Sequence, residues 1–129
     1  MKRYILLIFI NLLILIGGCS SYDEKTIEQL LEKEGFTNIE EIIITNGSTG
    51  EMKTITGKTQ IDELLSLINN VTLYKDANQE AGDGFLYSLL FKEESKKLSI
   101  SNNLVHDTYY KTDPNLANIL KLFYEQLNE

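Results

Sequence analysis

The chain has 129 residues, of which 43% are hydrophobic and 24% charged, and a formal net charge of −7. These values are ordinary for one small globular domain and argue against a disordered chain. Lys2 and Arg3 are the only charged residues before Cys19, so ten basic and 19 acidic residues remain from Cys19 onward, a net charge of −9. Because phosphate binding needs clustered lysine and arginine, this acidic excess argues against nucleic acid as a partner and against electrostatic adhesion to anionic lipid.

Residues 1–18 have the pattern of a signal peptide. Lys2 and Arg3 precede an apolar run, from Tyr4 to Ile16, that only Asn11 interrupts. A helix of this length rises about 20 Å, whereas the hydrocarbon core of a membrane is about 30 Å thick, so the run is short for a permanent span. The positive charge before the run orients the N-terminus towards the cytoplasm.

A cysteine follows the apolar run, in the motif Ile16, Gly17, Gly18 and Cys19. This motif resembles the lipobox of bacterial lipoproteins, in which a branched apolar residue and two small residues precede a cysteine. The resemblance implies cleavage before Cys19, attachment of lipid to its thiol, and anchoring to the cell membrane at its extracytoplasmic face. The alternatives are an inert cysteine in an uncleaved anchor and a buried core thiol. Since Cys19 is the only cysteine, the folded part has no internal disulfide.

We expect residues 19–22 to form a short tether and residues 23–129 to form a single domain. A helix is predicted over 24–34, with Asp23 as its N-cap and Gly35 just after its end. Its apolar stripe, at the i, i+3, i+4 spacing of a helix, consists of Ile27, Leu30 and Leu31.

A hairpin, a second helix and a short strand are predicted next. Strands over 36–45 and 51–56 flank a turn of Asn, Gly, Ser and Thr residues. The helix begins with a capping-type threonine, Thr59, and continues to about residue 68. A strand over 71–75 follows.

The last third of the domain is predicted to hold strands and a final helix. After a loose stretch over 76–84, strands are expected over 85–91, 98–100 and 104–111, the last with a break near Asp107. A charged turn over 92–97 and a polar turn over 101–103 separate these strands. The final helix is predicted to start at Asp113 as N-cap with Pro114 at N1.

Helices placed between groups of adjacent strands predict an α+β fold, an antiparallel sheet with helices packed on one face. The expected order is α-β-β-α-β-β-β-β-α.

The sequence contains few residues in patterns that could catalyse a reaction or bind a metal ion. His106 is the only histidine, and Asp107 beside it would face the other way on a strand. From Asp76 onward the spacing of oxygen-bearing side chains fails the EF-hand pattern, so cation binding by residues 76–84 stays an open question. We therefore expect no enzyme, no catalytic residue, no metal site and no cofactor.

Tyrosines on the predicted strands are the weak candidates for ligand binding. Tyr87, Tyr109 and Tyr110 could stack a ligand on a sheet face, and adjacent Tyr109 and Tyr110 face opposite ways on a strand. The alternative is that these are ordinary strand residues, which tyrosine favours.

The part after Cys19 resembles, at low specificity, small uncharacterised lipoproteins of Gram-positive bacilli, through residues 84–89 and through Tyr109 and Tyr110 ahead of a C-terminal helix. We therefore expect a membrane-anchored lipoprotein with a small non-catalytic binding domain and a protein partner in the cell envelope. The alternative is a small inhibitor or immunity-type protein that acts on an extracellular enzyme or toxin, because its acidic surface suits a basic target.

Overall fold

The computed structural model describes residues 24–80, 85–101 and 104–127, so the lipobox and Cys19 lie outside the described residues. These residues confirm the α+β class, with three helices and an eight-stranded antiparallel sheet. The elements are β1 (Glu24–Thr26), α2 (Ile27–Lys33), β2 (Glu41–Asn46), β3 (Met52–Ile55), α3 (Lys58–Ile68), β4 (Thr72–Lys75), β5 (Tyr87–Glu93), β6 (Lys96–Ser101), β7 (Leu104–Val105), β8 (Thr108–Asp113) and α4 (Leu116–Gln126).

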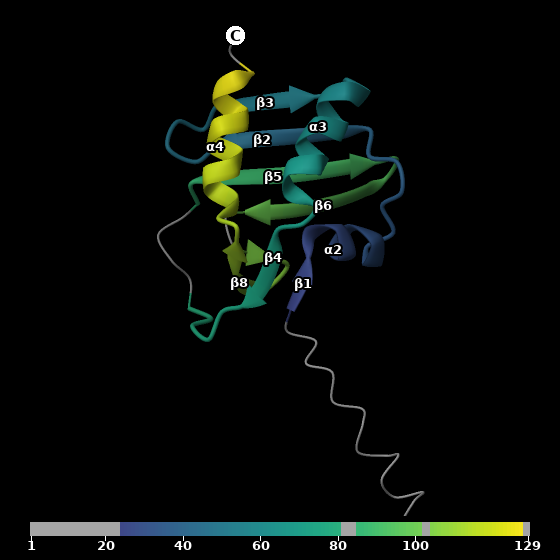
Figure 1. Ribbon diagram of the computed structural model, residues 1–129. Helices are drawn as coiled ribbons and strands as arrows, with labels where there is room; N and C mark the ends of the chain where they lie inside the picture. Colours follow the sequence, from purple (N-terminus) through teal and green to yellow (C-terminus); the bar gives the residue numbers. More distant parts are fainter. Residues whose placement is uncertain (1–23, 81–84, 102–103, 128–129) are drawn as a thin grey trace, which may run out of the picture.

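The strands form one sheet in the order β1-β4-β8-β7-β6-β5-β2-β3. Figure 1 shows α3 and α4 side by side across one face of β3, β2, β5 and β6. The sheet twists strongly, so that β1, β4 and β8 lie at its lower end, and α2 lies beside β1. The expected arrangement of α3 and α4 on one face of the sheet is therefore observed.

The core lies between this sheet and the helices. Alternate residues of the central strands point into it, and so do Leu64 and Ile68 of α3 and Leu120 of α4. The intervening strand residues, such as Ser99 between buried Leu98 and Ile100, are on the opposite face of the sheet. One hydrophobic cluster thus contains residues from every described element except β1.

The prediction of a helix from residue 24 is wrong for its first turn. Residues Glu24–Thr26 form β1, which pairs with β4, and the helix starts at Ile27. The cap is Thr26 rather than Asp23, which lies outside the described residues. Thr26 and Gln29 form a capping box, in which Gln29 N donates to Thr26 Oγ1 (3.2 Å) and Thr26 N donates to Gln29 Oε1 (2.9 Å).

The strand predicted over 36–45 begins only at Glu41. Residues 36–40, of which Phe36 and Ile39 are apolar, precede the sheet, and the ladder with β5 starts at the pair Glu41 and Lys92. The turn predicted over 92–97 is shorter than expected, because both ends pair as β5 and β6 and only Glu94 and Ser95 remain between them. Glu94 takes a positive φ of 52° there.

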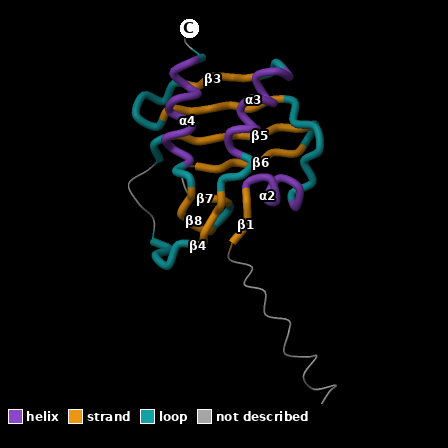
Figure 2. Tube along the Cα trace, in the orientation of Figure 1, coloured by secondary structure: helices purple, strands orange, loops and turns teal. Residues whose placement is uncertain are grey.

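The break expected near Asp107 is confirmed. The strand predicted over 104–111 is two antiparallel strands, β7 and β8, joined by a turn at His106 and Asp107 (Figure 2). The final helix starts later than predicted. Its N-cap is Asn115, whose side chain accepts a hydrogen bond from Asn118 N at 3.1 Å, so Pro114 precedes the helix instead of occupying N1.

Gly47, just after β2, packs directly against the chain that leads into β5. Its amide donates to the carbonyl oxygen of Leu86 at 2.8 Å. A Cβ atom at this position would lie 1.8 Å from the carbonyl oxygen of Phe85, well inside van der Waals contact. Only glycine fits this backbone crossing without a shift.

Candidate functional site

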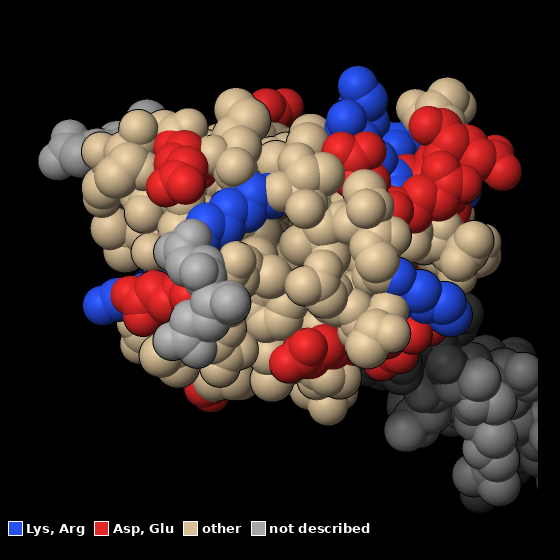
Figure 3. All heavy atoms as spheres, turned by 90° about the horizontal axis from the view of Figure 1, so that it is seen from above, with Lys and Arg blue, Asp and Glu red and all other residues tan. Residues whose placement is uncertain are grey.

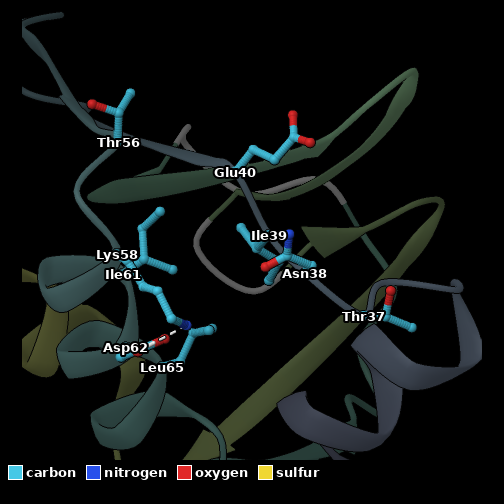
Figure 4. A pocket seen from close by; sticks show the side chains of 9 residues that line it. All are labelled: Thr37, Asn38, Ile39, Glu40, Thr56, Lys58, Ile61, Asp62 and Leu65. Atoms are coloured by element: carbon cyan, nitrogen blue, oxygen red, sulfur yellow. Dashed lines mark ion pairs between the residues drawn. The ribbon is translucent and has the colours of Figure 1, made fainter.

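A groove between α2 and α3 is a concave surface that the described residues offer for binding. It consists of two adjacent hollows with volumes of about 400 and 200 Å³. Thr37, Ile39 and Leu65 line both hollows and form the ridge between them. We call this surface the α2–α3 groove; its other lining residues are Asn38, Glu40, Thr56, Lys58, Ile61 and Asp62 in the larger hollow, and Glu28, Leu31, Glu32, Phe36 and Asn69 in the smaller one. Figure 4 shows the larger hollow.

Apolar side chains form part of the floor of the α2–α3 groove, and polar groups form the rest of its lining. Leu31, Phe36 and Ile61 belong to the buried core and present part of their side chains to the groove. Ile39 and Leu65 are only partly buried against that core. A ligand that covers the exposed parts of Ile39 and Leu65 would gain free energy, because it removes apolar surface from water.

Residues 36–40 form one wall of the groove, and hydrogen bonds hold this segment outside the sheet. Phe36 N donates to the carbonyl of Leu31 at 3.0 Å, and Glu40 N donates to the carbonyl of Lys92 at 3.0 Å. Between them, the amides of Thr37 and Asn38 donate to the carboxylate of Glu93. This carboxylate accepts the amide hydrogen bonds that a neighbouring strand would otherwise accept. The wall is therefore held in place without a ligand.

Glu93 is a buried acid with a complete set of partners. Its side chain is only 6% exposed, and its carboxylate lies 2.7 Å from Lys96 Nζ. The hydrogen bond from Lys96 lowers the pKa of Glu93 most; burial opposes this shift, and the amides of Asn38 and Thr37 and the charge of Lys96 reinforce it. Lys96 also donates to the carbonyl of Gly35 and lies over the ring of Phe36. Hydrogen bonds to Glu93 and from Lys96 thus join the β5–β6 hairpin to the groove wall.

The rim of the α2–α3 groove carries more negative than positive charge. Glu28 and Glu32 border the smaller hollow, whereas Glu40, Asp62 and Lys58 border the larger one. Lys58 Nζ lies 3.2 Å from Asp62 Oδ2, and Figure 4 shows this pair beside Leu65. The two side chains are 83% and 58% exposed, so the pair is weak.

Away from the groove rim, acidic and basic side chains lie close to one another on the surface. Figure 3, the view from above, shows acidic and basic side chains close together at the right-hand end and a largely uncharged middle. The acidic excess is therefore not gathered into one patch on this face.

The structure separates the three candidate tyrosines. Tyr87 starts β5 and packs against Tyr124 of α4, with their ring centroids 5.6 Å apart. Tyr110 of β8 is buried, with Lys25 Nζ 5.1 Å from its ring centroid, and Tyr109 beside it is partly buried. None of the three lines either hollow of the α2–α3 groove.

Tyr124 has a polar environment of its own at the end of α4. Its hydroxyl is the one buried side-chain polar atom among the described residues without a hydrogen bond of good geometry. Burial raises the pKa of Tyr124 most, and the neighbouring carboxylate of Glu51 raises it further. Lys53 Nζ lies 3.7 Å from the centroid of the Tyr124 ring and donates to the Tyr124 carbonyl at 2.8 Å. These contacts fix the end of α4 on β3.

His106 is on the surface, in the turn between β7 and β8, with a φ of 51°. Its Nε2 lies 2.9 Å from Oε1 of Glu34, the residue that caps the end of α2. Within the described residues, no group of three or more His, Cys, Asp or Glu is arranged to hold a metal ion. In the candidate cation loop, Asp76 and Asn78 use a side-chain oxygen to accept from the amides of Asn78 and Glu80; residues 81–84 lie outside the described residues.

Sequence reasoning missed the α2–α3 groove, because its residues come from two helices and the segment between α2 and β2. In the sequence, the acidic residues of the groove rim cannot be told apart from ordinary solvent-exposed acidic residues. Leu65 belongs to the apolar stripe predicted for α3, at i+4 from Ile61. Unlike Ile61, Leu64 and Ile68 it is only partly buried, and it lines the groove.

Comparison with known proteins adds no relative: no family model, curated protein or solved structure matches this chain significantly. No helix in the described part of the chain has the length and apolar character needed to span a membrane.

Proposed function

We propose that this chain is a lipid-anchored lipoprotein at the extracytoplasmic face of the cell membrane, and that its domain binds a protein partner in the α2–α3 groove without catalysing a reaction. The lipobox-like motif that ends at Cys19 supports the anchor. The observation that carries the binding role is a groove in which Ile39 and Leu65 stay partly exposed and one wall of which Glu93 holds in place.

The anchor also sets how far β1 can lie from the membrane. Only four residues separate Cys19 from β1, which starts at Glu24. Even fully extended, the chain from Cys19 to Glu24 spans at most about 18 Å. In the anchored protein β1 therefore lies close to the membrane surface, and an envelope protein is within reach of the domain as a partner.

The Cys19→Ala variant tests the anchor. We expect it to lose all incorporation of radioactive palmitate and to leave the membrane fraction or accumulate unprocessed, because the alanine side chain has no thiol to carry lipid. Metabolic labelling followed by fractionation measures both effects. Ser20→Ala, a change of similar size at the next residue, is the control and should label normally. Unchanged labelling of Cys19→Ala would contradict the lipoprotein assignment.

A photoreactive phenylalanine at Thr37 tests the groove. Thr37 is exposed and lines both hollows, so we expect irradiation of living cells to join the anchored protein to a partner. Gel electrophoresis and mass spectrometry detect the adduct. The same photoreactive residue at Ser99, which is exposed on the opposite face of the sheet, is the control. The proposal fails if Thr37 forms no adduct or if Ser99 forms the same one.

The second candidate is a small inhibitor or immunity-type protein. The acidic rim of the groove favours it, because such a rim suits a basic extracellular enzyme or toxin. In that case the adduct formed at Thr37 contains a secreted protein, and a membrane-resident partner would argue against this candidate.

A further inference from the structure

The shape of the α2–α3 groove restricts what can occupy it. Two hollows lie on either side of the ridge formed by Thr37, Ile39 and Leu65. A compact small molecule fills one cavity, whereas side chains two residues apart on an extended segment project from the same face about 7 Å apart. Two neighbouring hollows with a ridge between them therefore suit an extended segment that places one apolar side chain in each.

The charges on the rim restrict the occupant further. Four carboxylates and one ammonium group surround the floor: Glu28, Glu32, Glu40 and Asp62 against Lys58. All are on the exposed rim, where they attract an oppositely charged segment and repel one of like charge. The complementary segment therefore alternates apolar residues with lysine or arginine.

Lys58 occupies the position that a cationic residue of the occupant would take. Its side chain extends along the larger hollow to Asp62 and holds that carboxylate at 3.2 Å (Figure 4). Because both partners are largely exposed, the pair is held weakly and another cation can replace Lys58 at little cost. Lys58 thus competes with a cationic residue of the occupant for the carboxylate of Asp62.

We propose that the occupant of the α2–α3 groove is an extended cationic segment of the partner protein, which displaces Lys58 from Asp62 and places apolar side chains in the two hollows. This inference rests on the proposed function and specifies the chemistry of the partner. It also predicts opposite effects for the two members of one ion pair. Removal of the charge of Asp62 weakens binding of the segment, whereas removal of the charge of Lys58 tightens it.

The test uses a fluorescent seven-residue peptide that alternates lysine with isoleucine, and the full-length protein in discs of zwitterionic phosphatidylcholine. Fluorescence anisotropy measures the dissociation constant. We expect Asp62→Asn to weaken binding roughly fivefold and Lys58→Ala to tighten it about threefold. Leu65→Ala should weaken binding roughly tenfold through the lost apolar contact. Glu63→Gln is the matched control: it changes the same charge on the next residue of α3, outside both hollows, and should have little effect.

Two further peptides separate the groove from general electrostatic attraction. A peptide that alternates glutamate with isoleucine should not bind, and one that alternates lysine with serine should bind far more weakly. Equal binding of either peptide would overturn the proposal, as would an equal effect of Asp62→Asn and Glu63→Gln, or weaker binding by Lys58→Ala. Failure of the cationic peptide together with an adduct at Thr37 in cells would refute the cationic occupant and leave the binding role of the groove intact; failure of both would refute both.

Discussion

The Glu93→Gln variant is expected to melt at least about 5 °C below the wild type at pH 7 and to lose affinity for any groove ligand. The glutamine side chain keeps one acceptor oxygen but loses the charge that binds Lys96 at 2.7 Å and accepts from Thr37 and Asn38. Breaking a buried ion pair by removing one partner leaves the remaining charge poorly compensated. Circular dichroism during heating measures the loss of stability, and the fluorescent peptide measures the loss of binding.

The matched control for this substitution is Glu94→Gln. Glu94 is the next residue, is exposed, and undergoes the same change of charge. Its variant should melt within about a degree or two of the wild type, because surface substitutions away from such networks have small effects. Equal melting temperatures of Glu93→Gln and the wild type would mean that Glu93 does not hold the groove wall.

The same carboxylate makes stability depend on pH in a defined direction. Because the folded protein lowers the pKa of Glu93 below its ordinary value of 4.5, the ionised form stabilises the fold above that pH. The stabilisation falls as pH drops below 4.5 and Glu93 becomes protonated in the folded state. The difference in melting temperature between wild type and Glu93→Gln should therefore be largest near neutral pH and shrink below pH 4.5.

The Gly47→Ala variant is expected to lose about 1–3 kcal/mol of unfolding free energy. The added Cβ would lie 1.8 Å from the Phe85 carbonyl oxygen and 2.8 Å from the Phe85 carbonyl carbon, so backbone must move. That movement also strains the hydrogen bond from Gly47 N to the Leu86 carbonyl at the entry to β5. Chemical denaturation with urea gives the free energy from the midpoint and slope.

Gly57→Ala is the matched control for Gly47→Ala. Gly57 caps α3 with an ordinary φ of −69°, and the nearest atom to an added Cβ is Gln60 Oε1 at 3.7 Å. Because alanine is a poorer N-cap than glycine, its substitution should cost about 0.5–1 kcal/mol, less than the clash at Gly47. Similar losses for the two variants would show that the close approach of Gly47 to Phe85 is not what makes alanine unfavourable there.

Sequence patterns predicted the elements whose shape is decided locally. The stripe that includes Ile61, Leu64 and Ile68 predicted α3 to within one residue of each end, and alternation predicted β5 with a shift of two residues. The capping box of Thr26 and Gln29 was also readable, as a Thr-x-x-Gln motif, but the acidic residues before it favoured an earlier start.

The remaining features depend on contacts between distant parts of the chain. Nothing in residues 36–40 themselves reveals that Thr37 and Asn38 will meet Glu93, more than fifty residues later, and so leave the sheet. The same holds for the groove, which exists only because α2 and α3 pack near one another. The candidate tyrosines are defined by their residue type and by their predicted strands, whereas their surroundings follow from the strand order, which the sequence does not reveal.

The position of β1 has a mechanical consequence. It is the first described element, it forms an edge of the sheet, and only three residue pairs join it to β4. Any tension that reaches the domain through the preceding residues must therefore load this short ladder before it loads α2 or the core. The ladder would yield first under a steady pull, lengthening the connection by the three residues of β1 while the groove and its wall remain folded.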